Sequence, residues 1–175
     1  AVIGAGAVGG AMAALLDRAG HEVEVTARGA HLAAIREHGI RLGGAWGEHI
    51  APVAAGELLT RAPELVIVAT KAQDAPAAIR DNVDLLAGVP VLIVQNGLAG
   101  VETAEALLPD SECFGALSII AANYTEPGVV RVTTTAATYL GRGAGPVDEG
   151  TRDLAEVLSG AVPVVPIAHF RGAQW

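Results

Sequence analysis

Apolar and polar residues follow two different periods along the first hundred positions of the chain. Short apolar runs rich in β-branched residues are typical of strands buried on both faces of a parallel sheet, and apolar residues recurring every three or four positions indicate amphipathic helices. The two patterns alternate, with strands predicted at 1–3, 22–27, 65–70 and 89–94, helices at 6–19, 30–38, 74–86 and 100–108, and short strands or a loose hairpin at 40–50. Because helices that link parallel strands form right-handed crossovers, this order predicts a doubly wound α/β fold with a mostly parallel sheet.

After residue 110 the pattern changes. Three strand-like segments, at 113–121, 129–135 and 138–142, follow one another through turns instead of helices. We expect them to add antiparallel or mixed strands to one edge of the sheet. A helix is predicted at 151–159, with Leu154, Val157 and Leu158 facing inward. Prolines interrupt the last predicted strand, which suits a sheet edge.

The composition supports one globular domain. Among 175 residues, 51% are apolar and only 17% are charged, which excludes a disordered chain. The net charge of −8 disfavours nucleic acid and anionic membranes as partners. The longest uncharged run, residues 1–16, is too short and too rich in glycine to span a membrane. Cys113, the single cysteine, fits a reducing compartment and a small apolar role at the start of a strand, so we expect a cytoplasmic protein.

The turn after the first predicted strand carries a glycine-rich motif. Gly4, Gly6 and Gly9 form G-x-G-x-x-G in GAGAVGG, with an apolar strand before it, a helix opening inside it and a second strand after it. In Rossmann-type folds the first glycine permits a tight turn, the second lets a pyrophosphate approach the backbone, and the third lets the helix pack closely on the strand. The helix N-terminus adds N–H groups and a positive dipole end. We predict a dinucleotide at this turn, and a tight turn without a ligand is the alternative.

The end of the second predicted strand indicates which dinucleotide binds. A carboxylate at this place would hydrogen-bond the ribose 2′-OH of NAD. The strand end reads VTARGA, with Arg28 and with no acidic residue after Glu24, which lies mid-strand and cannot easily reach a ribose. A guanidinium can pair with the 2′-phosphate of NADP. We therefore predict NADP(H), with a solvated loop arginine as the other interpretation of Arg28.

Polar residues follow the two remaining strands of the parallel sheet. Lys71, the only lysine of the chain, comes directly after the third predicted strand, and Gln95 and Asn96 follow the fourth. Parallel strands bring their carboxyl ends to the crevice where ligands bind, so these side chains are expected to converge there. The alternatives are a solvated loop lysine and a hairpin turn at Asn96 and Gly97, although the helical pattern that follows argues against a hairpin.

No metal site and no other catalytic constellation is predicted. The five histidines lack metal-ligand spacing with one another and with Cys113, and surface or capping positions suit them better. Neither a Ser-His-Asp nor a Cys-His arrangement is visible.

These features together resemble the ketopantoate reductase (2-dehydropantoate 2-reductase) family. The resemblance rests on GAGAVGG, Arg28, VATKAQD, VQNGLAG, EPGVV and the closing QW, and it covers essentially the whole chain. It implies an NADPH-dependent reduction of 2-dehydropantoate (ketopantoate), a 2-keto acid, to pantoate on the route to pantothenate and coenzyme A.

The resemblance also implies roles for particular residues. The pyrophosphate would lie along the motif, at Gly4, Ala5, Gly6, Ala7, Val8 and Gly9. Arg28 would bind the 2′-phosphate. Lys71 and Asn96 would lie near the nicotinamide ribose as supporting residues, with Asn96 also touching the substrate. The backbone around Ala121 would contact the nicotinamide end.

The family's general acid has no counterpart in this sequence. In the family a lysine shortly after the tryptophan acts as general acid, and a helical C-terminal domain supplies substrate-binding residues. This chain stops at Trp175 and both of its ends look cut, so we expect a fragment. Residues 1–167 would form the NADP-binding domain, and 168–175 would begin the connection to a C-terminal helical domain absent from this chain. We expect NADPH binding with negligible turnover, and a homodimer formed through the missing domain is left open.

Two other functions stay open. The chain could be the cofactor domain of another two-domain NAD(P)-dependent 2-keto or hydroxy acid dehydrogenase, because nothing in it fixes the substrate. It could instead be a non-catalytic NADP-binding module that senses redox state. A lysine and a helical domain after Trp175 would favour an enzyme, and a stop or an unrelated domain would favour the sensor.

Overall fold

The computed structural model describes residues 1–95 and 99–174, and eight strands within these residues form the main sheet. In spatial order they are β12 (Val164–Pro166), β11 (Thr138–Gly141), β8 (Cys113–Ser118), β7 (Val91–Ile93), β6 (Val66–Val68), β1 (Val2–Ile3), β2 (Glu24–Thr26) and β5 (Ala54–Gly56). Neighbouring strands are parallel except for β8 and β11. The predicted Rossmann-type fold class is confirmed, and β12 lies at the edge, as its prolines predict.

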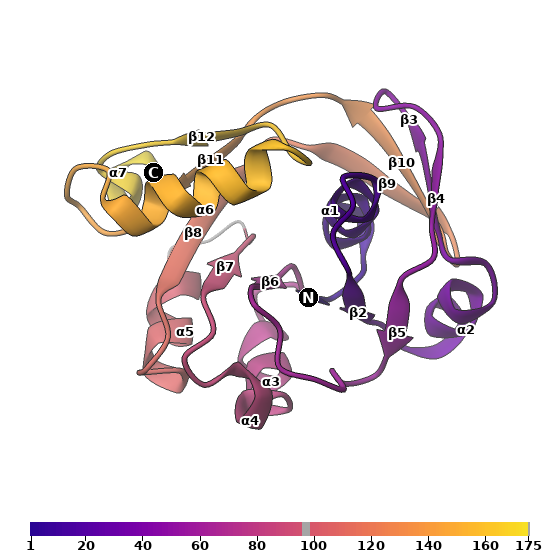
Figure 1. Cartoon of the computed structure of the whole chain (residues 1–175), viewed down its shortest axis with the longest axis horizontal. Helices are drawn as coiled ribbons and strands as arrows, with labels where there is room; N and C mark the ends of the chain where they lie inside the picture. Colours follow the sequence, from indigo (N-terminus) through magenta and orange to yellow (C-terminus); the bar gives the residue numbers. More distant parts are fainter. Residues whose placement is uncertain (96–98, 175) are drawn as a thin grey trace.

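Helices cover both faces of the main sheet (Figure 1). On one face lie α1 (Ala7–Arg18) and α6 (Glu149–Ser159), and on the other lie α3 (Ala75–Arg80), α4 (Val83–Leu86) and α5 (Gly100–Leu107). A further helix, α2 (Gly29–His38), packs beside β5. Each face buries its own cluster of apolar side chains, because successive residues of a strand point to opposite faces. The helices therefore hold the strands from both sides, as expected for a parallel sheet.

The predicted helix at 74–86 is interrupted at Asn82, which separates α3 from α4. The buried Asn82 amide donates a hydrogen bond of 2.8 Å to the carbonyl of Ala78, and its Oδ1 accepts one of 2.8 Å from the Leu59 N–H. Asparagine side chains that bond to nearby backbone compete with helix hydrogen bonds. Asn82 therefore ends α3 and ties it to the loop that follows β5.

The inward face of α6 differs from the prediction at one position. Leu154 and Leu158 are buried as expected, but Val157 is 54% exposed and Thr151 is buried in its place. Thr151 lies in the first turn, where its N–H donates a 2.8 Å hydrogen bond to the Asp148 carboxylate that caps the helix. The apolar pattern alone therefore predicted a buried face that is rotated toward Val157, away from the face that includes Thr151.

A second sheet of four strands was not predicted. Its order is β4 (His49–Ala51), β3 (Ile40–Gly44), β10 (Val129–Thr134) and β9 (Ala121–Glu126). The central pair, β3 and β10, is parallel, and the two outer pairs are antiparallel. The expectation that the strand-like segments after residue 110 extend one edge of the main sheet is therefore wrong for 129–135, which forms β10, and β9 was not predicted as a strand. Val130 and Val132 alternate with exposed residues in β10, so this strand has one buried face, and that face covers α1.

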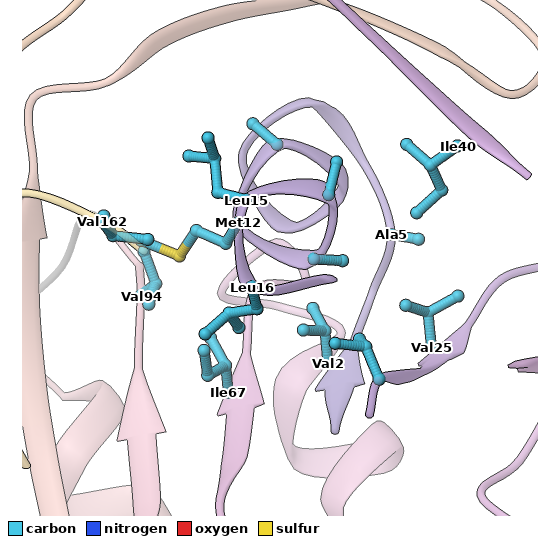
Figure 2. Close-up of a cluster of buried hydrophobic side chains, with 14 of the residues drawn as sticks. Val2, Ala5, Met12, Leu15, Leu16, Val25, Ile40, Ile67, Val94 and Val162 are labelled. Carbon is cyan, nitrogen blue, oxygen red and sulfur yellow. The ribbon is translucent and has the colours of Figure 1, made fainter. Parts of the chain in front are cut away.

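The helix α1 lies between the two sheets and is buried on both sides. All residues from Gly9 to Leu16 are buried, and α1 contacts β1 as well as β3, β4, β9 and β10. Figure 2 shows Met12 pointing toward Val94 and Val162 on the side of the main sheet. A Cβ atom on Gly10 would lie 2.9 Å from Val130 Cγ2 and 3.2 Å from the Ala5 carbonyl oxygen. Only a residue without a side chain fits where α1 meets β10.

The last described helix packs onto the main sheet. This helix, α7 (Phe170–Ala173), buries Phe170 against the glycines of two neighbouring strands. A Cβ atom on Gly115 would lie 2.2 Å from Phe170 Cε1, and one on Gly141 would lie 2.8 Å from Phe170 Cβ. The two glycines therefore make the space for the ring. The domain boundary predicted at residue 167 stays a prediction.

We predict that Gly10→Ala lowers the free energy of unfolding, because overpacking costs about 1–3 kcal/mol and outweighs a gain of about 1 kcal/mol in helix propensity. In a Val130→Ala background the contact with Val130 Cγ2 is gone and only the 3.2 Å approach to the Ala5 carbonyl oxygen remains, so the same substitution should cost less than in wild type. Urea unfolding of wild type, both single variants and the double variant measures the coupling. Equal effects of Gly10→Ala in the two backgrounds would contradict the close contact.

Candidate cofactor-binding site

A cleft of about 330 Å³ opens at the carboxyl ends of four adjacent strands, β6, β1, β2 and β5. Its lining comes from the glycine-rich turn after β1, the segment after β2, the loop after β5 and the start of α3. Ligands of open parallel sheets bind at this end of the strands. A larger hollow of about 810 Å³ lies beside Ala1, Glu24 and Pro90, toward the amino ends of the strands, and is lined by none of the predicted site residues. We therefore take the smaller cleft as the candidate site.

The glycine-rich turn has the geometry that its motif predicts. Gly4 has a φ of 96°, and its N–H donates a 3.0 Å hydrogen bond to the Thr26 hydroxyl at the end of β2. A Cβ atom on Gly9 would lie 2.1 Å from the Gly4 carbonyl oxygen and 2.9 Å from Ala69 Cβ, so α1 packs directly on the strand ends. A Cβ atom on Gly6 would meet nothing within 4 Å. Gly4 and Gly9 are thus needed for the fold, whereas open space lies beside Gly6.

This open space is what a bound dinucleotide requires. Gly6 lines the cleft and directly precedes α1, whose first N–H groups have no partners within the helix. A pyrophosphate beside Gly6 would meet these N–H groups and the positive end of the helix dipole. The residues present therefore fit the group that the motif predicts. The binding roles of Ala5, Ala7 and Val8 stay predictions.

Arg28 lies at the cleft, as expected of a residue that discriminates between dinucleotides. It is the N-cap residue of α2, its side chain is exposed, and it belongs to the cleft lining. Glu24 points elsewhere: its Oε1 accepts hydrogen bonds from the N–H and the hydroxyl of Thr60, at 2.9 and 2.7 Å. The prediction that Glu24 does not reach a ribose agrees with this arrangement.

The sequence did not show that a different acidic residue stands beside Arg28. Strands β2 and β5 are parallel neighbours with Thr26 opposite Gly56, and the Ala27 N–H donates a 2.9 Å hydrogen bond to the Gly56 carbonyl. Glu57 follows Gly56 and lines the same cleft as Arg28. Spacing along the chain could not reveal this carboxylate, because it comes from a strand added after α2 and the hairpin of β3 and β4.

The ends of the two remaining strands lie side by side, and the predicted convergence of their polar residues on the cleft stays a prediction. In the parallel pair of β6 and β7, Val68 lies opposite Ile93, and beyond them the Gln95 side-chain amide donates to the Thr70 hydroxyl at 3.5 Å. Lys71 follows Thr70 and is exposed. Asn96 lies outside the described residues.

Neither Lys71 nor Ala121 belongs to the lining of the cleft. The Lys71 carbonyl accepts hydrogen bonds from the N–H groups of Asp74 and Ala75 and so starts α3. Ala121 is an exposed residue at the start of β9, and its carbonyl accepts a 3.1 Å hydrogen bond from the Thr133 hydroxyl. The roles predicted for both residues therefore stay predictions.

The remaining candidates carry no chemistry of their own in the described residues. Cys113 is buried at the start of β8, and burial raises the pKa of its thiol to about 11, so the thiol stays protonated at neutral pH. Within residues 1–95 and 99–174 no group of three or more histidine, cysteine or acidic side chains could hold a metal ion. In the same residues no helix is long and apolar enough to cross a membrane.

The parallel sheet, the glycine-rich turn and the cleft at the strand ends define a Rossmann-type dinucleotide-binding domain. Residues 1–145 match the model of one family, ketopantoate reductase PanE/ApbA, and the chain belongs to that family. The family resemblance of the sequence is thereby confirmed.

Relatives with known names agree with this assignment. A 2-dehydropantoate 2-reductase of Halobacterium salinarum is 30% identical over 181 residues, covering 99% of this chain and 59% of the relative. One of Pyrococcus horikoshii is 29% identical over 140 residues, covering 80% of this chain and 46% of the relative. The chain spans about half the length of the curated relatives it matches.

Solved structures share the fold over nearly the whole chain. A PanE/ApbA family ketopantoate reductase from Ralstonia eutropha superposes with a TM-score of 0.89 at 32% identity, covering 99% of this chain and 58% of that one. A D-mandelate dehydrogenase solved with NADH and anilino(oxo)acetate has a TM-score of 0.85 at 23% identity, covering 94% of this chain and 55% of that one. The second likeness shows the fold alone.

We predict that Gly9→Ala lowers the free energy of unfolding by about 3 kcal/mol, because backbone atoms of the turn must move to admit the new methyl group. Gly6→Ala is the matched control: its backbone has a φ of −68° and its Cβ would lie in open space. Thermal or urea unfolding should leave Gly6→Ala within about 0.5 kcal/mol of wild type. Similar losses for both variants would contradict the distinction between the two glycines.

Proposed function

We propose that this chain is the NADP(H)-binding part of a cytoplasmic enzyme that reduces 2-dehydropantoate (ketopantoate) to pantoate in pantothenate biosynthesis. The observation that carries the proposal is a cleft in which the open glycine turn and the Arg28 cation lie together, in a chain of the ketopantoate reductase family. Relatives of this chain bear the name of that activity, which supports the choice of substrate.

The glycine-rich turn and Arg28 would hold the two charged parts of the cofactor. In this proposal the turn from Gly4 to Gly9 lies against the pyrophosphate, with the N–H groups of Gly6 and of the start of α1 facing it, and the Arg28 guanidinium pairs with the 2′-phosphate. The pyrophosphate and the 2′-phosphate would then be held at the ends of two neighbouring strands, β1 and β2, whose separation the sheet sets.

The nicotinamide end would lie toward the ends of β6 and β7. Lys71 and Asn96 are proposed near its ribose, with Asn96 also near the substrate, and the backbone around Ala121 is proposed at the nicotinamide. NADPH, when bound, supplies the hydride that a 2-keto acid accepts. Negative charge then builds on the ketone oxygen, so a proton donor is needed there. We assign this donor to the part of the family that follows the matched half, and we place the end of the cofactor domain at residue 167.

One observation favours NAD(H) as a second candidate cofactor. Glu57 lines the cleft beside Arg28, and a carboxylate in this place can accept a hydrogen bond from a ribose 2′-OH but repels a 2′-phosphate. A protein that shares this fold, D-mandelate dehydrogenase, was solved with NADH, so the fold is compatible with that cofactor. Under this candidate the chain would belong to a dehydrogenase of another 2-keto or hydroxy acid.

Arg28→Ala tests the choice of cofactor. Loss of a charge-assisted hydrogen bond of about 2 kcal/mol should lower the affinity for NADPH about 30-fold and leave that for NADH nearly unchanged. Fluorescence titration with both nucleotides measures the ratio. Arg36→Ala on the same helix is the matched control, because Arg36 donates to the Ala55 carbonyl and does not line the cleft. An unchanged ratio in Arg28→Ala would refute the 2′-phosphate role, and a wild type that prefers NADH would favour the second candidate.

Residues 1–175 should bind NADPH but oxidise it negligibly in the presence of ketopantoate, because the proposed proton donor lies elsewhere in the enzyme. Absorbance at the nicotinamide band follows oxidation, and a chain that also carries the C-terminal part of the family should turn over the same mixture. Full activity of residues 1–175 alone would contradict the proposed division between the cofactor-binding part and the part that supplies the proton donor.

Gly6→Ala, whose methyl group would enter the open space of the cleft, should weaken NADPH binding about tenfold, a loss of about 1.4 kcal/mol.

A further inference from the structure

His31 joins three parts of the structure through one imidazole ring. It lies in the first turn of α2, three residues after Arg28. Its Nε2 is 2.6 Å from the carbonyl oxygen of Ala5 in the glycine-rich turn. The Gly128 N–H, from the turn between β9 and β10, donates a 3.0 Å hydrogen bond to Nδ1. Tyr124 of β9 packs edge-on against the ring, with centroids 4.8 Å apart and an interplanar angle of 85°.

These two hydrogen bonds determine which ring nitrogen carries the proton. A backbone N–H can only donate, so Nδ1 accepts from Gly128 and carries no hydrogen. A backbone carbonyl can only accept, so the nitrogen beside Ala5 must donate. The two contacts therefore place the ring hydrogen on Nε2, and the Nε2–H donates to the Ala5 carbonyl.

The bond to Ala5 also orients the neighbouring N–H of the turn. Ala5 and Gly6 share one trans peptide plane, in which the carbonyl of Ala5 and the N–H of Gly6 point in opposite directions. With the carbonyl held by His31, the Gly6 N–H points away from the ring. Gly6 lines the cleft, and no hydrogen bond within residues 1–95 and 99–174 takes its N–H.

We propose that His31 is a positioning residue for the cofactor: its Nε2–H holds the Ala5 carbonyl and thereby aims the Gly6 N–H at the pyrophosphate. The inference rests on the proposed function, because it assumes that a dinucleotide binds at this turn. The same ring fixes the turn of α2 that carries Arg28, since the Leu32 N–H bonds to the Arg28 carbonyl in that turn. The pyrophosphate and 2′-phosphate positions are thus linked through one side chain.

Two substitutions separate the two hydrogen bonds of the ring. His31→Gln places an amide N–H near the position of Nε2 and can keep the bond to Ala5 while losing the one from Gly128. His31→Asn places an amide oxygen near the position of Nδ1 and can keep the bond from Gly128 while losing the one to Ala5. Each variant loses one bond, so the two should lose similar stability, about 1 kcal/mol. Their affinities for NADPH should differ.

The expected result is an NADPH dissociation constant within about twofold of wild type for His31→Gln and about fivefold to tenfold higher for His31→Asn. Fluorescence titration measures the affinity, and urea unfolding of the same samples measures stability. Equal affinities in the two variants would overturn the inference while leaving the proposed function intact. A wild type that binds neither NADPH nor NADH would refute the proposed function and this role together.

A second measurement uses the wild-type chain and does not depend on how the variants fold. Nitrogen-15 NMR of the histidine rings distinguishes a protonated ring nitrogen from an unprotonated one. At neutral pH His31 should show a protonated Nε2 and an unprotonated Nδ1, and the hydrogen should stay on Nε2 when NADPH is added. A hydrogen on Nδ1 in either state would overturn the inference.

Discussion

The fold depends on how closely α1 approaches both of its neighbours. On one side Gly9 lets the helix rest on the turn that precedes it and on the end of β6, and on the other side Gly10 lets it rest on Val130 of β10. A single methyl group at either position would push backbone or buried side chains apart. Two adjacent glycines therefore allow one helix to serve as the shared layer between two sheets.

The candidate site follows from the same constraint. Because α1 packs closely on both sides, its N-terminus has a fixed position at the carboxyl ends of the strands. The open space beside Gly6 therefore keeps its shape. The second sheet does more than cover α1. The Gly128 N–H in its turn bonds to His31, and His31 in turn bonds to the Ala5 carbonyl of the glycine-rich turn. A cofactor site formed in this way would depend on residues far from it in sequence.

The sequence was sufficient for the features that local patterns determine. Apolar runs marked β6 and β7, and the spacing of Gly4, Gly6 and Gly9 marked the turn, because each reflects neighbours within one strand–helix unit. The pairing of β3 with β10 was missed, because nothing near either strand records a partner almost ninety positions away. Glu57 and His31 were missed for the same reason, because their importance comes from neighbours in space. Glu57 lines the cleft with Arg28 from the neighbouring strand, and His31 bonds to Ala5, 26 residues away in the glycine-rich turn.

The parallel pairing of β3 with β10 also affects the order in which the molecule can form. One apolar side of α1 can pack as soon as the first strands exist, but its other side is covered only in part, by β3 and β4, until Val130 and Val132 have been made. Synthesis at about 5–20 residues per second leaves the rest of that side exposed for several seconds or more. Contacts so distant in sequence also slow folding, because a long loop must close before they form. On the ribosome, part of the apolar surface of α1 therefore stays exposed until the second sheet is complete.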